Sequence, residues 1–418
     1  MITRARNLIK NPAFSRVVIV TAGSFIGSVF AYLLQIFLGR WLSVSDFGTF
    51  TALLSVYVIL GVLATSFTTS LIKLVSNLST QNKYGTLTRI FLELSTVVLG
   101  VGSLLFTLIF LFRQQLASFL SISDPNLLIY FGAFLGLSFL VILPIAYLQG
   151  LLKFKAYAAF SVSTQFLRLI IPVLIVMAGF KLAGAFVGMG LSFAGSYLIG
   201  TWMLSKHFLK SDDVSLKHYY KNVLAFAGSV LFVQIGLTLL NNIDIVLVKH
   251  FFDETSAGLY AGLVTTGKVL LFGASTVGVV MFPTISSAYG NGEDVLEKFR
   301  PLLILQIMVV IVGVVVFTLM PNFITRVMFG ASYLASAELL PRFSIFVGMY
   351  VLINFMILFF LAVEKTKVVL LLLPAITLQV ILISLHHESL VSVVNVNLAI
   401  SFALLLGVGI YFIKSIKS

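Results

Sequence analysis

The sequence contains no cysteine and very little charge. The absence of cysteine from all 418 residues excludes disulfides, thiolate metal sites and cysteine nucleophiles. Charged residues make up 10% of the chain, whereas a soluble domain carries about 25%. Because 60% of the residues are hydrophobic and the mean hydropathy is +1.12, the composition predicts an all-α protein that crosses a membrane several times.

Long polar segments are also scarce. The longest lie at 205–221, 286–300 and 321–338, which leaves no room for a soluble catalytic domain. No glycine-rich phosphate loop ends in Lys-Ser or Lys-Thr, so we expect no ATP hydrolysis by this chain, no enzymatic activity and no cofactor. His386 and His387 are adjacent and lack the helical i, i+4 spacing of a zinc site, so we predict a solvated turn there and no metal site.

Twelve apolar stretches fill the remainder, each close to the 20 or so residues that cross the hydrocarbon of a bilayer. The predicted spans are 17–39, 48–72, 90–112, 127–149, 157–179, 182–204, 222–248, 257–282, 301–320, 339–362, 368–385 and 391–413.

The net charge of +13 would suit nucleic acid, but its distribution points to a membrane and to no nucleic-acid partner. With twelve spans and a cytoplasmic N-terminus, the cytoplasmic side carries nineteen of the 27 lysines and arginines, and the outer connections carry six. The six are Arg40, Arg113, Lys181, Lys249, Arg326 and Arg342. This asymmetry follows the positive-inside rule and predicts that both termini are cytoplasmic.

The basic segment 1–16 leads directly into the first span without a small-residue cleavage site. We therefore expect a retained signal anchor rather than a secretory signal. The lack of transit-peptide character favours a bacterial or archaeal plasma membrane.

Two segments suggest an internal repeat. Residues 40–50 read RWLSVSDFGTF and residues 250–260 read HFFDETSAGLY, so that a polar turn, a glycine (Gly48, Gly258) and an aromatic residue two positions later recur after about 210 residues. Six spans separate the copies, which predicts two parallel six-helix lobes at 1–204 and 222–418 with a cytoplasmic linker at 205–221. Span 6 is rich in glycine and alanine, which favours close helix packing.

Two cations lie near the middle of predicted spans, where a charge costs roughly 3 kcal/mol on insertion scales and marks a candidate functional site. Lys268 follows Thr265, Thr266 and Gly267, a polar segment typical of a wall that faces a wet cavity. Its ammonium indicates either an anionic ligand or a structural pair with Asp244.

Arg168 lies at a similar depth, three residues after Gln165, so the two side chains share a helix face. The arginine could bind a ligand, or it could cap the backbone carbonyl that Pro172 releases one turn earlier.

Further polar residues are candidates with less support. Asp244 closes Asn241-Asn242-Ile243-Asp244, which predicts a cation or proton site, a partner for Lys268, or a hydrogen-bond cluster between lobes. Asn242 joins the candidate substrate-binding residues. Glu93 and Arg40 lie near span ends and are more typical of interfaces. Weaker candidates for a polyol-binding path are Gln35, Gln234, Asn354 and Gln379.

Several short motifs carry a resemblance to a known family. They are the turn at 42–50, the end of span 4 (Leu148-Gln149-Gly150-Leu151-Leu152-Lys153-Phe154), Asn242-Ile243-Asp244, Ala257-Gly258-Leu259-Tyr260-Ala261 and Phe282-Pro283. The chain resembles, over nearly its whole length, the Wzx-type O-antigen and exopolysaccharide flippases of the multidrug/oligosaccharidyl-lipid/polysaccharide exporter superfamily.

The resemblance implies a V-shaped bundle of two six-helix lobes around a cationic cavity. It implies transport of an undecaprenyl-diphosphate-linked oligosaccharide across the bacterial inner membrane, by alternating access, for O-antigen or exopolysaccharide assembly. The diphosphate would compensate Lys268 and Arg168, with Arg40, Gln165 and Asn242 nearby in the substrate path. Asp244 or Glu93 would serve ion coupling with H⁺ or Na⁺. Membrane lipids and other polysaccharide-assembly proteins are the further partners expected.

Two alternatives stay open. A cation-coupled drug exporter of the same superfamily would depend on Asp244 or Glu93 rather than on the basic residues. A membrane glycan polymerase or transferase would need catalytic acidic residues and would make a covalent product.

Overall fold

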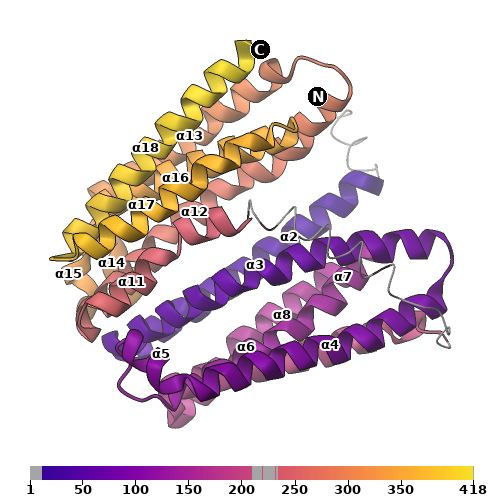
Figure 1. Ribbon diagram of the computed structural model, residues 1–418, viewed down its shortest axis with the longest axis horizontal. Helices are drawn as coiled ribbons and strands as arrows, with labels where there is room; N and C mark the ends of the chain where they lie inside the picture. The colour runs from indigo at the N-terminus through magenta and orange to yellow at the C-terminus, as the bar shows by residue number, and fades with distance from the viewer. Residues whose placement is uncertain (1–11, 210–218, 220–230, 232–233, 418) are drawn as a thin grey trace. The chain divides into compact units, whose positions relative to one another are not determined.

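The computed structural model describes the backbone of residues 12–209, 219, 231 and 234–417 (Figure 1). Every regular element in these residues is helical, and the fold there contains no strand. Every predicted span overlaps helical residues, and the end of 222–248 lies in α11 (Ile243–Phe251). Residues 222–230, 232 and 233 of that span, and most of the predicted linker at 205–221, lie outside the described residues. In the described part, nine segments are long and apolar enough to cross a membrane.

The contacts divide the chain into two compact units. The first contains Met1–Leu38 and Leu60–Leu231, and the second contains Gly39–Ile59 and Phe232–Ser418. The boundary therefore passes through α3 (Val44–Thr80), so that the beginning of this helix packs with the second unit. The predicted division into lobes at 1–204 and 222–418 places residues 39–59 in the first lobe, whereas the contacts group them with the second unit. The division into two six-helix lobes remains a prediction.

The first unit is built from α2 (Pro12–Trp41) as far as Leu38, the later part of α3, α4 (Tyr84–Leu111), α5 (Arg113–Phe119), α6 (Leu127–Ser138), α7 (Ile142–Gly150), α8 (Phe154–Ile175) and α9 (Lys181–Leu204). Helix α6 packs between α4 and α9, and α9 packs along α8. A Cβ atom on Gly188 of α9 would lie 2.5 Å from Cα of Pro172 in α8. The small residues predicted in span 6 therefore allow two backbones to approach closely.

The second unit contains α11 (Ile243–Phe251), α12 (Glu254–Gly290), α13 (Val295–Leu319), α14 (Pro321–Phe329), α15 (Leu334–Ala337), α16 (Leu340–Ala362), α17 (Leu372–Leu385) and α18 (Leu390–Lys417). Figure 1 shows α16, α17 and α18 side by side, and α16 also packs on α12 and α13. Phe299 of α13 is fully buried and stacks on Phe355 and Phe359 of α16, with ring centroids 5.7 and 4.0 Å away.

The two glycines that suggested the repeat lie against each other within the second unit. A Cβ on Gly48 would lie 2.7 Å from the backbone nitrogen of Gly258, and a Cβ on Gly258 would lie 2.1 Å from the carbonyl oxygen of Val44. Beside this contact, the hydroxyl of Ser45 donates to Oε2 of Glu254 at 2.6 Å. The beginnings of α3 and α12 therefore cross at equivalent positions of the two repeat copies, and only glycine fits there.

The helix ends on the predicted cytoplasmic side also recur. Asn82 and Gly292, about 210 residues apart, both have left-handed φ angles, of 57° and 69°, and so do Leu152 and Glu364, at 57° and 59°. In each turn the amide of the residue after the left-handed one donates to the carbonyl five residues before itself, the bond that closes a helix C-terminus. The two halves thus have the same backbone conformation at corresponding turns. This conformation supports a parallel repeat independently of the sequence motif.

The glycine crossing yields a stability prediction. Gly258→Ala should lower the stability of the folded protein by about 1–3 kcal/mol, because the added methyl must displace the backbone of Val44. Gly273→Ala in the same helix is the matched control, since a Cβ there meets nothing within 4 Å. Thermal unfolding of the full chain in detergent measures both variants. Equal unfolding temperatures would contradict the close contact.

The left-handed turns yield a second prediction. Glu364→Gly should stabilise the protein by about 1 kcal/mol, because glycine adopts this conformation without the cost that a Cβ imposes. Glu364→Ala removes the same carboxylate but keeps the Cβ, so it should leave the unfolding temperature lower than Glu364→Gly does. Gly292→Ala should destabilise by a similar amount, although space is open around it. The same thermal unfolding assay checks all three.

Candidate functional site

The candidate site in the second unit forms where a helix breaks at Asn241 and Asn242. Asparagine competes for backbone hydrogen bonds and is typical of helix ends, and α11 restarts here with Asn242 at its N-cap position. Asp244 therefore lies in the first turn of α11, where the helix dipole stabilises a negative charge.

Asp244 lies in a buried network drawn from four helices, which we call the Asp244 cluster: Asp244 of α11, Tyr260 of α12, Gln379 of α17 and Asn397 of α18. The hydroxyl of Tyr260 donates to Oδ2 of Asp244 at 2.6 Å, and Nδ2 of Asn397 donates to the same oxygen at 3.2 Å. Nε2 of Gln379 donates to Oδ1 of Asn397 at 2.8 Å. All four residues are 1% exposed or less.

Lys268 lies beside this cluster, half-buried in α12. Its Nζ donates to Oδ1 of Asn242 at 2.9 Å, and it lies within electrostatic range of Asp244. The structure thus brings together three predicted residues, Lys268, Asn242 and Asp244. A neutral amide rather than the carboxylate holds the ammonium.

The segment before Lys268 differs from the expected cavity wall. Thr265, Thr266 and Gly267 are buried, and the Thr266 hydroxyl donates back to the carbonyl of Gly262 at 2.8 Å. A Cβ on Gly267 would lie 2.5 Å from the ring of Phe343. Gly267 therefore packs against α16, while Thr265 and Thr266, which point in other directions around the helix, are buried as well.

Arg168 of the first unit is held in a similar way. Its Nη1 donates to Oε1 of Gln165 at 2.9 Å, which agrees with the predicted shared face. Gln165 in turn donates to the carbonyl of Gly27 in α2 at 3.4 Å. The guanidinium also lies over the ring of Phe193, 5.0 Å from its centroid, a cation–π contact between α8 and α9.

The other two charged candidates have local partners. Nε of Arg40 donates to the carbonyl of Met328 at 3.0 Å, and the guanidinium also bonds the carbonyl of Val327, so Arg40 caps the C-terminus of α14. Glu93 accepts from Nε of Arg89 at 2.9 Å, one turn earlier in α4. Their roles in substrate binding or ion coupling remain predictions.

Sequence analysis missed Asn397. A signal was present, since Asn395 and Asn397 interrupt an apolar span, but the partner of Asn397 lies 153 residues earlier. Within the described ranges, no group of three or more His, Cys, Asp or Glu side chains could hold a metal ion.

These helices, with charged side chains enclosed among them, define a multi-pass membrane protein with the fold of transporters of the MOP superfamily. The chain belongs to the polysaccharide biosynthesis protein family, whose model matches residues 15–289. A comparison with curated protein sequences found no match.

Three solved structures illustrate the shared fold. The lipid II flippase MurJ in an inward closed conformation has a TM-score of 0.74 at 15% identity, covering 96% of this chain and 88% of MurJ. An inward-facing multidrug resistance MATE family transporter of the MOP superfamily has a TM-score of 0.72 at 14% identity, covering 96% of this chain and 99% of the transporter. A MOP superfamily transporter from Pyrococcus furiosus has a TM-score of 0.61 at 15% identity, covering 98% of each chain. The binding pocket of that transporter is described as having reverse polarity.

The Asp244 cluster yields a testable prediction. Tyr260→Phe should lower the stability of the folded protein by about 1.5–3 kcal/mol, because it removes a hydrogen bond to a buried carboxylate. Tyr289→Phe near the end of the same helix is the control, since Tyr289 is 45% exposed. Thermal unfolding in detergent measures the difference. An unchanged unfolding temperature for Tyr260→Phe would show that the hydroxyl does not stabilise Asp244.

Proposed function

We propose that this protein is a flippase that moves an undecaprenyl-diphosphate-linked oligosaccharide from the cytoplasmic to the outer leaflet of the bacterial inner membrane. It would supply repeat units for O-antigen or exopolysaccharide assembly and would keep both termini in the cytoplasm. Membership in the polysaccharide biosynthesis protein family and the transporter fold support this proposal.

The observation that carries the proposal is the state of Lys268. Its ammonium lies half-buried at membrane depth and donates to a neutral amide, that of Asn242. An amide oxygen orients an ammonium but carries no negative charge, so the ammonium can attract an anion in addition to the nearby Asp244. A lipid diphosphate supplies that anion, while its isoprenoid tail stays in the bilayer.

Arg168 would make a second phosphate contact. Gln165 and the Phe193 ring hold the guanidinium in place, and a planar guanidinium suits bidentate binding of phosphate oxygens. Arg40 and Asn242 would line the substrate path.

Asp244 would couple transport to an H⁺ or Na⁺ gradient. The carboxylate is buried, is bonded by Tyr260 and Asn397, and lies within electrostatic range of Lys268. Protonation of Asp244, or cation binding to it, would change the field at Lys268 and hence its affinity for phosphate. Glu93, paired with Arg89, is the weaker candidate for this role.

A drug exporter is the second candidate function, because a MATE family transporter shares the fold and Asp244 is buried. It predicts that Asp244 or Glu93 is essential and that Lys268 and Arg168 are dispensable. A glycan transferase predicts instead a covalent product formed from donor and acceptor.

The charge dependence is the sharpest test. Lys268→Ala and Arg168→Ala should each lower surface polysaccharide by about 10- to 150-fold, the effect of losing a charge-assisted hydrogen bond worth about 1.5–3 kcal/mol. Lys268→Arg should keep part of the activity because it keeps the charge. Lys298→Ala, which removes an exposed lysine of the same unit, is the control.

The experiment compares these variants in a gene-deletion strain of the native host, at equal protein levels. The deletion should abolish surface polysaccharide and leave complete repeat units on the lipid, inaccessible from the outer face. If both alanine variants restore full surface polysaccharide, the cationic mechanism is wrong. Normal surface polysaccharide with raised drug sensitivity in the deletion strain would favour the drug exporter.

A further inference from the structure

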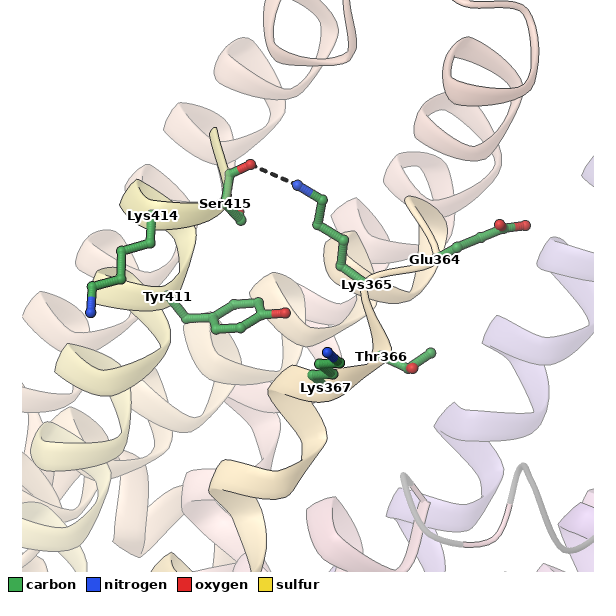
Figure 2. Close-up of a pocket in the computed structure, with 7 residues that line it drawn as sticks. All are labelled: Glu364, Lys365, Thr366, Lys367, Tyr411, Lys414 and Ser415. Carbon is green, nitrogen blue, oxygen red and sulfur yellow. Dashed lines mark hydrogen bonds between the residues drawn. The ribbon is translucent and has the colours of Figure 1, made fainter. Parts of the chain in front are cut away.

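A second basic site lies apart from the Asp244 cluster, at the end of the second unit where α16 stops and α18 finishes. It is a hollow of about 610 Å³, and its lining comes from the turn after α16, the start of η5 (Thr366–Leu371) and the last turns of α18. Figure 2 shows the lining residues: Glu364, Lys365, Thr366, Lys367, Tyr411, Lys414 and Ser415.

The hollow is strongly positive. Three of its lining residues are lysines and one is acidic, and Figure 2 shows the Glu364 carboxylate pointing away from the lysines. Nζ of Lys365 donates to the carbonyl of Ser415 at 2.6 Å, which ties the turn to α18. Lys367 and Lys414 are exposed on the two sides, and the ring of Tyr411 extends from α18 toward the turn.

The residues next to the hollow are apolar and exposed. Leu370 and Leu373 follow Lys367 at 65% and 52% exposure, and Ile410 and Ile413 precede Lys414 at 55% and 58%. All belong to segments apolar enough to span a membrane, so these side chains face lipid. The lysines therefore lie at the boundary between acyl chains and water, on the predicted cytoplasmic side.

The first unit carries an equivalent set at the corresponding positions of the repeat. Lys153 and Lys155 follow the left-handed Leu152, as Lys365 and Lys367 follow the left-handed Glu364. Lys206 lies just after the end of α9, as Lys414 lies in the last turn of α18. The neighbouring His207 lies within electrostatic range of Lys153. Because lysines recur one and three residues after the left-handed residue in both halves, we regard this pair as a built feature of the repeat.

We propose that the hollow lined by Lys365, Lys367, Lys414 and Tyr411 binds the phosphate of an anionic phospholipid headgroup from the cytoplasmic leaflet. The ammonium groups would donate to the non-bridging phosphate oxygens, and the acyl chains would lie along Leu370, Leu373 and Ile413. A free phosphate shares the headgroup chemistry but gains nothing from the apolar border, so the lipid is the ligand that fits the whole site. This proposal does not depend on the transport function.

The test titrates the full-length protein, in neutral detergent, with phosphatidylglycerol carrying a fluorescent acyl chain. The double substitution Lys367→Gln and Lys414→Gln should weaken saturable binding by at least tenfold, because each lysine near an anionic surface contributes about a fivefold factor. Phosphatidylcholine with the same chain should bind more weakly. Lys83→Gln is the matched control, since Lys83 is an exposed lysine in the equivalent kind of turn outside the hollow.

Each result decides the proposal. The headgroup site is supported if the double variant binds phosphatidylglycerol more weakly, Lys83→Gln binds it like the unmodified protein, and the unfolding temperature does not change. Equal binding by the double variant and the unmodified protein overturns it. If inorganic phosphate at millimolar concentration displaces the labelled lipid as well as unlabelled phosphatidylglycerol does, the site recognises free phosphate and the lipid assignment is wrong.

Discussion

The hydrocarbon of a membrane offers no water to a polar group, so each buried donor and acceptor needs a partner within the protein. The helices meet this constraint for the backbone, and the charged side chains of the candidate site meet it in part through polar neutral neighbours. Asp244 accepts from Tyr260 and Asn397, Lys268 donates to Asn242, and Arg168 donates to Gln165. These bonds hold each charged group in place. A site for a charged cargo needs charged groups that are held in this way.

The sequence predicted the helices well because their signals are local. Apolar runs of membrane length, a glycine recurring after about 210 residues, and the three-residue spacing of Gln165 and Arg168 all appear within short windows. The sequence could not predict the partners of distant residues. Asn397 reaches Asp244 across 153 residues, and Arg40 caps α14 across 288. Nor could the hydropathy of α3 indicate that the helix is divided between two units, since the apolar run continues across the boundary.

The two proposed phosphate sites lie in different environments. Lys268 is half-buried and an amide fixes its ammonium, so polar contacts there would act more strongly than at the surface. At Lys365, Lys367 and Lys414, water screens the charges, and affinity comes from several lysines together with the apolar border. The two kinds of site would differ in salt dependence, with the outer one more sensitive.

The crossing of Gly48 and Gly258 has a consequence for biosynthesis. The chain segment that carries Gly48 is made first, and its partner follows about 210 residues later. At about 5–20 residues per second, this delay lasts roughly 10–40 seconds. During that interval, the beginning of α3 and the hydroxyl of Ser45 have neither Gly258 nor Glu254 to contact. The second unit therefore contains a segment that is synthesised before most of its own helices exist, and lipid or the insertion machinery must cover that segment until Gly258 has been made.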